Sequence, residues 1–346
     1  MSEATAIALL LDTLDVLERI ARYLHPSRLE ALVATLGKRD AALRGAIDGA
    51  RWREPLREPL RRAAEATLRA CEGLRAAAGS ADAPRGAYRA LRQVNQALEA
   101  LYPLAAVLPT VDRFFLASGG SAIGAPRSRA PVGVMHFANE TGERGGFSLY
   151  VPEDYNEARD YPLVMALHGG SGHGRLFMWS WLREVRGRSV LLAAPTAIGS
   201  TWSLMEPEVD GVHLERVLAR VARRWRVDRA RLLLTGMSDG GTFTLLSGLA
   251  GASPFTHLAP VAASFHPSLL TMASPHRMAG LPIYLVHGAL DWMFPVSVAR
   301  SAWKALRAAG GNVTYREIAD LSHVYPREEG SAILDWLVRP VSPRAQ

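Results

Sequence analysis

The sequence has a single cysteine, only two lysines and no long uninterrupted hydrophobic run. Cys71 has no partner for an internal disulfide, and the helical pattern around it favours a buried, neutral thiol over redox chemistry. No apolar stretch is long enough to span a bilayer. Residues 1–24 lack a basic leader and carry acids among their leucines, which is unlike a secretory signal. We therefore expect a cytoplasmic protein without a membrane span.

Acidic residues are outnumbered, and the net charge is +7, yet the excess is not concentrated. Nearly all of the 40 basic residues are arginine, spread along the chain and mixed with acids. The densest group, between Arg216 and Arg226, alternates with leucine and valine at helical spacing. That spacing favours a solvated outer helix face over an anion site. Because a nucleic-acid surface would gather the charge on one face, we expect no nucleic-acid partner.

Residues 1–116 have the pattern of an all-helical domain. Apolar residues recur at three- and four-residue steps within Ile7–Leu24, Leu29–Leu36, Leu56–Leu74 and Tyr88–Leu101. Each helix has one apolar stripe, so the stripes bury against one another, and a bundle of about four helices is the simplest outcome. The region has no metal-ligand spacing and no phosphate-binding loop. We interpret it as a packing unit, through which the chain could form a homo-oligomer, or as a lid over the active site.

Beyond this region the composition changes twice. The glycine, proline and serine content of residues 117–133 predicts a linker. Residues 134–346 then alternate short apolar runs with helical patterns, which predicts an α/β domain with a mostly parallel sheet and helices on both faces. The expected strands are 146–151, 163–167, 189–194, 231–235, 258–263, 283–287 and 313–318.

The stretch that organises this domain is Leu232–Gly241, in which an apolar run enters Gly236-Met237-Ser238-Asp239-Gly240 and a helical pattern follows. A serine on a tight turn between strand and helix needs small residues two positions before and after it, because strand and helix nearly touch there. The pattern predicts that Ser238 is a nucleophile. A purely structural turn is the alternative.

Glycines also follow the strand 163–167, in the loop His168–Gly174. They would allow backbone N–H groups to approach a developing oxyanion, which acyl transfer requires. We assign the oxyanion hole to the N–H groups of Asp239 and Gly170, with Gly169 beside them. The Asp239 side chain is expected to point away. His168 is expected to shape the loop rather than act as a base, and the loop lacks the lysine of a phosphate-binding loop.

The two remaining catalytic candidates follow later strands. Asp291 comes after the strand 283–287 and His323 after the strand 313–318. Functional residues collect at the carboxyl ends of parallel strands, so Asp291 could orient His323 and His323 could accept the Ser238 proton. A helix cap for Asp291 and a surface position for His323 are the alternatives. Three further residues, Trp202, Trp292 and His168, are candidate substrate contacts.

On these residues the sequence from about 145 to 338 resembles the α/β-hydrolase esterases related to polyhydroxybutyrate depolymerases, feruloyl esterases and bacterial predicted esterases. The resemblance is carried by Tyr150-Val151-Pro152, Leu167-His168-Gly169-Gly170, Val227-Asp228, Gly236–Gly241, His287-Gly288, Asp291 and His323. It implies the α/β-hydrolase fold, a Ser-His-Asp triad and an acyl-enzyme, with no metal or organic cofactor. We expect a serine esterase for small to medium acyl or aryl esters. A serine peptidase of the same fold and a catalytically idle binding scaffold are the alternatives.

Overall fold

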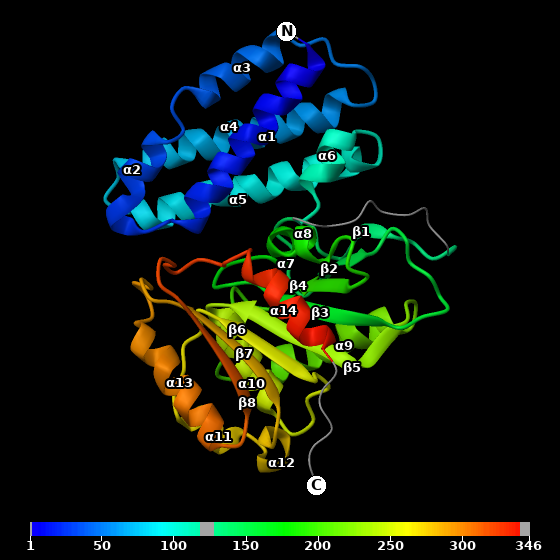
Figure 1. The fold of residues 1–346 in the computed structure, drawn as a ribbon, viewed down its shortest axis with the longest axis vertical. Helices are drawn as coiled ribbons and strands as arrows, with labels where there is room; N and C mark the ends of the chain where they lie inside the picture. Colours follow the sequence, from blue (N-terminus) through cyan, green and yellow to red (C-terminus); the bar gives the residue numbers. More distant parts are fainter. Residues whose placement is uncertain (1, 118–127, 340–346) are drawn as a thin grey trace. The chain divides into compact units, whose positions relative to one another are not determined.

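The computed structural model describes residues 2–117 and 128–339, which divide into two units (Figure 1). The helical unit consists of Met1–Ala117 together with Asp320–Val324, and the sheet unit consists of the rest of the chain. Most of the predicted linker, residues 118–127, lies outside the described residues. Within the described ranges, no helix combines the length and the hydropathy needed to cross a membrane.

The helical unit contains six α-helices within its described residues. They are α1 (Glu3–Arg22), α2 (Leu29–Ala34), α3 (Arg39–Gly49), α4 (Arg57–Ala78), α5 (Ala83–Leu101) and α6 (Pro109–Phe114), with 3-10 turns η1 (Pro26–Arg28) and η2 (Tyr102–Ala106). The predicted all-helical region is therefore confirmed.

Helices α4 and α5 pack closely because small residues face each other along their contact. A Cβ built on Gly73 would lie 2.8 Å from the Cβ of Ala90, and one built on Gly86 would lie 2.9 Å from the Cβ of Ala77. Glycine at these two positions lets the backbones approach. Cys71 is wholly buried in the same region, and burial raises the pKa of its thiol to about 11. The prediction of a buried, neutral thiol is confirmed.

The sheet unit is built on one eight-stranded sheet. Its strands are β1 (Gly133–Phe137), β2 (Phe147–Val151), β3 (Tyr161–Leu167), β4 (Leu191–Pro195), β5 (Val227–Met237), β6 (His257–Val261), β7 (Pro282–Gly288) and β8 (Asn312–Ile318). Its helices are α7 (Gly174–Phe177), α8 (Leu182–Val185), α9 (Pro207–Ala222), α10 (Asp239–Leu249), α11 (Ser268–Met272), α12 (Pro275–Met278), α13 (Val296–Ala308) and α14 (Glu329–Val338), with the 3-10 turn η3 (Met178–Ser180). The strand order is β1-β2-β4-β3-β5-β6-β7-β8.

Parallel pairing begins at β4 and continues to β8, while β1 and β2 are antiparallel to their neighbours. The carboxyl ends of β3 to β8 therefore lie at one edge of the sheet, and β5, which leads into Ser238, is near its middle. This is the α/β-hydrolase fold class that the sequence predicts.

Helices cover both faces of the sheet, which explains why inner strands such as β2, β3 and β4 are buried along their whole length. Alternate residues of β3, such as Leu163 and Met165, share one core with α9, α10 and α13. The residues between them face the other side of the sheet, where the rings of His257 and Tyr284 pack against Trp336 of α14.

Seven predicted strands are present, with ends that differ from the prediction by up to four residues. The additional strand is β1, Gly133–Phe137, which begins at the last residue of the predicted linker. Only its first residue is fully buried. An edge strand of this kind has no continuous apolar run, so the sequence pattern misses it.

His257 on β6 makes the stability of the sheet unit sensitive to acid. It is 4% exposed, and burial, with a smaller contribution from the charge of Arg231, lowers its pKa to about 4. Above pH 6.5 the imidazole is neutral in both folded and unfolded chains. Between pH 6.5 and 4 the unfolded chain binds the proton more tightly, so the free energy of unfolding falls as the pH falls.

We expect this histidine alone to cost about 3 kcal/mol of stability between pH 6.5 and pH 4. Urea unfolding of the wild type and of His257→Gln across this range measures the cost. Other acid-sensitive groups act equally on both proteins, so the wild type should lose more stability than the variant. Parallel curves for the two proteins would refute the prediction.

Candidate active site

Ser238 stands on a strained turn between β5 and α10. Its backbone has φ 56° and ψ −120°, a conformation that a non-glycine residue adopts only at a free-energy cost. Its N–H donates to the carbonyl of Val261 at 2.9 Å, and its own carbonyl accepts from the N–H of Thr242 at 2.8 Å. The turn is thus held by the next strand, β6, and by the first turn of α10.

The two flanking glycines are required by backbone contacts. A Cβ built on Gly236 would lie 2.4 Å from the carbonyl oxygen of Gly240. One built on Gly240 would lie 2.4 Å from the carbonyl oxygen of His168 and 2.5 Å from that of Leu167. Since no Cβ fits at these distances, strand and helix can approach this closely only with glycine at both positions.

The loop after β3 lies directly beside the serine. A Cβ on Gly169 would be 3.6 Å from the Cβ of Ser238, in ordinary contact. One on Gly170 would be only 2.8 Å from a carboxylate oxygen of Asp239. The structure therefore brings together Ser238, Asp239 and the two glycines, the residues from which the sequence predicts the nucleophile and the oxyanion hole.

His168 fixes the orientation of the peptide between Gly169 and Gly170. The N–H of Ala197 approaches Nε2 of the imidazole at 3.1 Å. A backbone N–H only donates, so Nε2 is the acceptor and the proton is on Nδ1, which donates to the carbonyl of Gly169 at 2.7 Å. In a trans peptide the N–H points opposite to the carbonyl, so the N–H of Gly170 is directed away from the imidazole. His168 shapes the loop, and both ring nitrogens are used inside the protein.

The two tryptophans differ in their surroundings. Trp202 is 1% exposed; its Nε1 donates to the carbonyl of His168 at 2.7 Å, and its ring stacks on Phe243. It supports the loop after β3 from within the core. Trp292, in the loop after β7, is 40% exposed. A substrate contact by either of them, or by His168, stays a prediction.

Asp291 is 7% exposed and lies just beyond the end of β7. One carboxylate oxygen accepts from the N–H groups of Met293 and Phe294, at 2.9 and 2.8 Å. The other lies 3.4 Å from Nε2 of His287, which is 2.9 Å from the carbonyl of Phe294. These contacts fix the orientation of the carboxylate. The sequence analysis includes His287 in the family resemblance but does not predict that its ring lies beside Asp291.

His323 belongs to the helical unit, in the segment Asp320–Val324 that follows β8. It is 3% exposed, and its carbonyl accepts a hydrogen bond from the hydroxyl of Tyr88 at 2.6 Å. Asp320 pairs with Arg22 at 2.9 Å, and this guanidinium holds the pKa of the carboxyl below its usual value. Ser238 and Asp291 belong to the sheet unit, so the three-residue triad stays a prediction.

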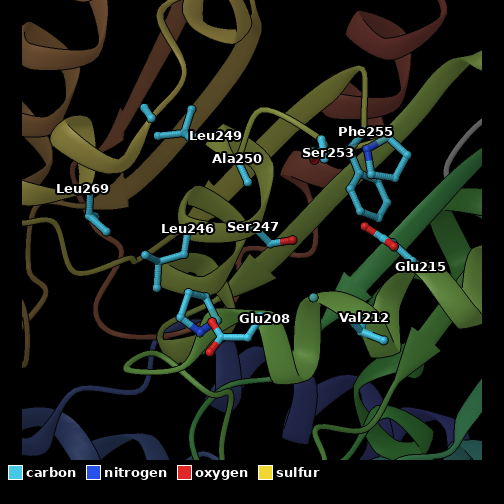
Figure 2. Close-up of a pocket in the computed structure, with 15 residues that line it drawn as sticks. Glu208, Val212, Glu215, Leu246, Ser247, Leu249, Ala250, Ser253, Phe255 and Leu269 are labelled. Carbon is cyan, nitrogen blue, oxygen red and sulfur yellow. The ribbon is translucent and has the colours of Figure 1, made fainter.

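Among the described residues, no three His, Cys, Asp or Glu side chains gather as they would around a metal ion. A pocket of about 330 Å³ lies between α9 and the end of α10, and Glu208, Val212, Leu246 and Phe255 are among its lining residues (Figure 2). It lies at the opposite end of α10 from Ser238 and contains none of the predicted site residues.

The family model for phospholipases and carboxylesterases matches residues 213–338. None of the curated proteins matches the chain.

Solved structures that are similar to this chain include two esterases and an S-formylglutathione hydrolase. A thermostable esterase is 20% identical, with 59% of this chain and 61% of that chain covered and a TM-score of 0.44. Esterase PE8 is 20% identical, with 55% and 97% covered and a TM-score of 0.46. S-formylglutathione hydrolase from Staphylococcus aureus is 14% identical, with 63% and 100% covered and a TM-score of 0.47. At these identities the similarity concerns the fold alone.

Proposed function

We propose that the chain is a carboxylic ester hydrolase and that Ser238 is its nucleophile; the match of residues 213–338 to the phospholipase/carboxylesterase family model supports the proposal. The observation that carries this proposal is the strained turn of Ser238 beside the Gly169–Gly170 loop. A strained backbone at a buried serine costs free energy, and such strain is typical of sites where it serves function. The chain order Ser238, Asp291, His323 supports the same assignment.

The proposed reaction proceeds in two halves. His323, oriented by Asp291, accepts the proton of the Ser238 hydroxyl as its oxygen attacks the ester carbonyl. The oxyanion receives hydrogen bonds from the N–H groups of Gly170 and Asp239, with Gly169 beside them. When the carbon–oxygen bond breaks, the leaving alcohol takes the proton from His323. Water then attacks the acyl-enzyme by the same steps and releases the acid.

We infer small to medium acyl or aryl esters as the substrate class. In this proposal Trp292 supplies an apolar contact for the substrate, since its side chain is partly exposed beyond the end of β7. An oligomer formed through the helical unit and a cytoplasmic location complete the proposal as expectations from the sequence.

Hydrolysis of p-nitrophenyl esters from acetate to decanoate tests the proposal. We expect Ser238→Ala to lower kcat by roughly 10⁴-fold, because no other group replaces the nucleophile. Ser247→Ala is a matched control, since Ser247 is a half-buried serine near the end of α10, the helix that follows Ser238, and lines the pocket of Figure 2. It should keep its activity within about twofold. Equal rates for the wild type and Ser238→Ala would exclude Ser238 as the nucleophile, and cleavage of p-nitroanilides faster than of esters would favour a peptidase.

A further inference from the structure

The segment Ile198–Ser203 after β4 is held at both ends by one buried carboxylate. Asp210 of α9 is fully buried; one of its oxygens accepts from the N–H of Ile198 at 3.0 Å and the other from the N–H of Ser203 at 2.8 Å. The hydroxyl of Ser203 accepts in return from the N–H of Asp210 at 3.1 Å. Charge-assisted hydrogen bonds of this kind are stronger than neutral ones, so the segment has a defined position.

The middle of this segment contacts the residue that follows the nucleophile. The hydroxyl of Thr201 donates to the carboxylate of Asp239 at 2.6 Å. The same carboxylate oxygen is the atom that a Cβ on Gly170 would approach to 2.8 Å. The Asp239 carboxylate therefore lies between Thr201 and Gly170. It sets the spacing between the backbones of Gly170 and Asp239.

Arg144 ties the segment to the loop after β3. Its Nε donates to the carbonyl of Gly199 at 2.8 Å, and its Nη1 donates to the carbonyl of Gly172 at 2.7 Å. Its Nη2 is buried without a hydrogen-bond partner among the described residues, and this burial lowers the pKa of the guanidinium. Arg144 thus joins the carbonyls of Gly199 and Gly172, one on each segment, through a single side chain.

We propose that Thr201, Asp239 and Arg144 are positioning residues that set the geometry of the oxyanion hole. The segment Ile198–Ser203, called the brace below, holds the two donors, the N–H groups of Gly170 and Asp239, at a fixed spacing. The inference rests on the proposed esterase function, because it assigns these contacts to the donors of Gly170 and Asp239. Oxyanion donors stabilise the transition state only when they are fixed in advance, and small displacements weaken them. The brace acts through the backbone and does not touch the substrate.

The test compares Thr201→Val, which removes the hydroxyl at nearly constant shape, with Thr201→Ser, which keeps it. We expect Thr201→Val to lower kcat about 10- to 100-fold with little change in KM, because the loss falls on the transition state. Affinity for a trifluoromethyl ketone, whose adduct with Ser238 carries an oxyanion, should fall in proportion to kcat/KM. Thr201→Ser should restore most of both. Thr67→Val is the control, because Thr67 is a fully buried threonine whose hydroxyl donates to Ala63 within α4.

An unchanged kcat in Thr201→Val, or a change in KM alone, would overturn the brace. A second measurement separates this outcome from failure of the proposed function. Amide hydrogen exchange of residues 169–174 should accelerate at least several-fold in Thr201→Val and stay unchanged in Thr67→Val, whether or not any ester is cleaved. An inactive wild type with accelerated exchange would refute the esterase assignment and keep the brace, whereas unchanged exchange would refute the brace itself.

Discussion

Replacing Ser238 by glycine is expected to abolish ester hydrolysis and to raise the free energy of unfolding by about 1 kcal/mol. The serine has φ 56° and ψ −120°, which glycine adopts without a steric penalty. Relief of the strain, about 1–3 kcal/mol, exceeds the additional conformational entropy that glycine loses on folding, about 0.5–1 kcal/mol. The chain would therefore become more stable as it lost its proposed nucleophile.

Ser238→Ala is the comparison that isolates the backbone contribution. It removes the same hydroxyl but keeps a Cβ on the strained backbone, so it should not share the gain in stability. Urea unfolding of both variants and of the wild type measures the difference, with turnover of a p-nitrophenyl ester measured in parallel. If glycine and alanine at this position give the same unfolding midpoint, the strain is not stored at Ser238.

Gly240→Ala is expected to have the opposite effect and to destabilise the sheet unit by roughly 3 kcal/mol or more. The new Cβ would lie 2.4 Å from the carbonyl oxygen of His168 and 2.5 Å from that of Leu167. Both atoms belong to the backbone at the end of β3, so no side chain can move aside to make room. We expect activity to be lost as well, because relief of the clash must displace β3 or α10.

Gly211→Ala provides a matched control for this substitution. Gly211 lies within α9, and a Cβ built on it has no atom within 4 Å beyond its own helix. The same change there should raise the free energy of unfolding by about 0.5–1 kcal/mol, since alanine is the better helix former. Chemical unfolding measures both variants, and the prediction fails if Gly240→Ala unfolds at the midpoint of the wild type.

The fold was predictable where its elements are buried on both sides or carry a strong apolar stripe. Strands β2 to β7 contain buried apolar runs because helices cover both faces of the sheet, and such runs are visible in one sequence. Strand β8, at the other edge, alternates half-buried and exposed residues, which is also a strand pattern. Helix α3 buries only Leu43 and Ala46, so its stripe is too weak to be recognised as a separate helix. Strand β1, at the edge, is not recognised from the sequence either, because only its first residue is buried.

The candidate site was predictable where chemistry requires a local pattern. The turn at Ser238 needs glycines two residues before and after it, and the loop after β3 needs glycines where it contacts the serine. Both requirements can therefore be seen in the sequence as glycine patterns. Thr201, Asp210 and Arg144 form no such pattern, because each is a single polar residue on a different segment and they meet only in the folded chain. The position of Trp202 was equally undetermined, since a tryptophan after a strand fits a core as well as a pocket wall.

The segment Asp320–Val324 makes the helical unit discontinuous in the chain, and this has a consequence for how the protein folds. Tyr88 and His323, which share a hydrogen bond, are 235 residues apart, and Arg22 and Asp320 are 298 apart. Closing loops of this length costs about 5 kcal/mol of chain entropy, and contacts so distant in sequence form slowly. During synthesis the helices emerge first, but their unit is complete only after residue 324 has left the ribosome. The segment that carries His323 is thus among the last parts of the protein to be placed. If His323 is the proposed base, the protein should become active only after most of its secondary structure has formed.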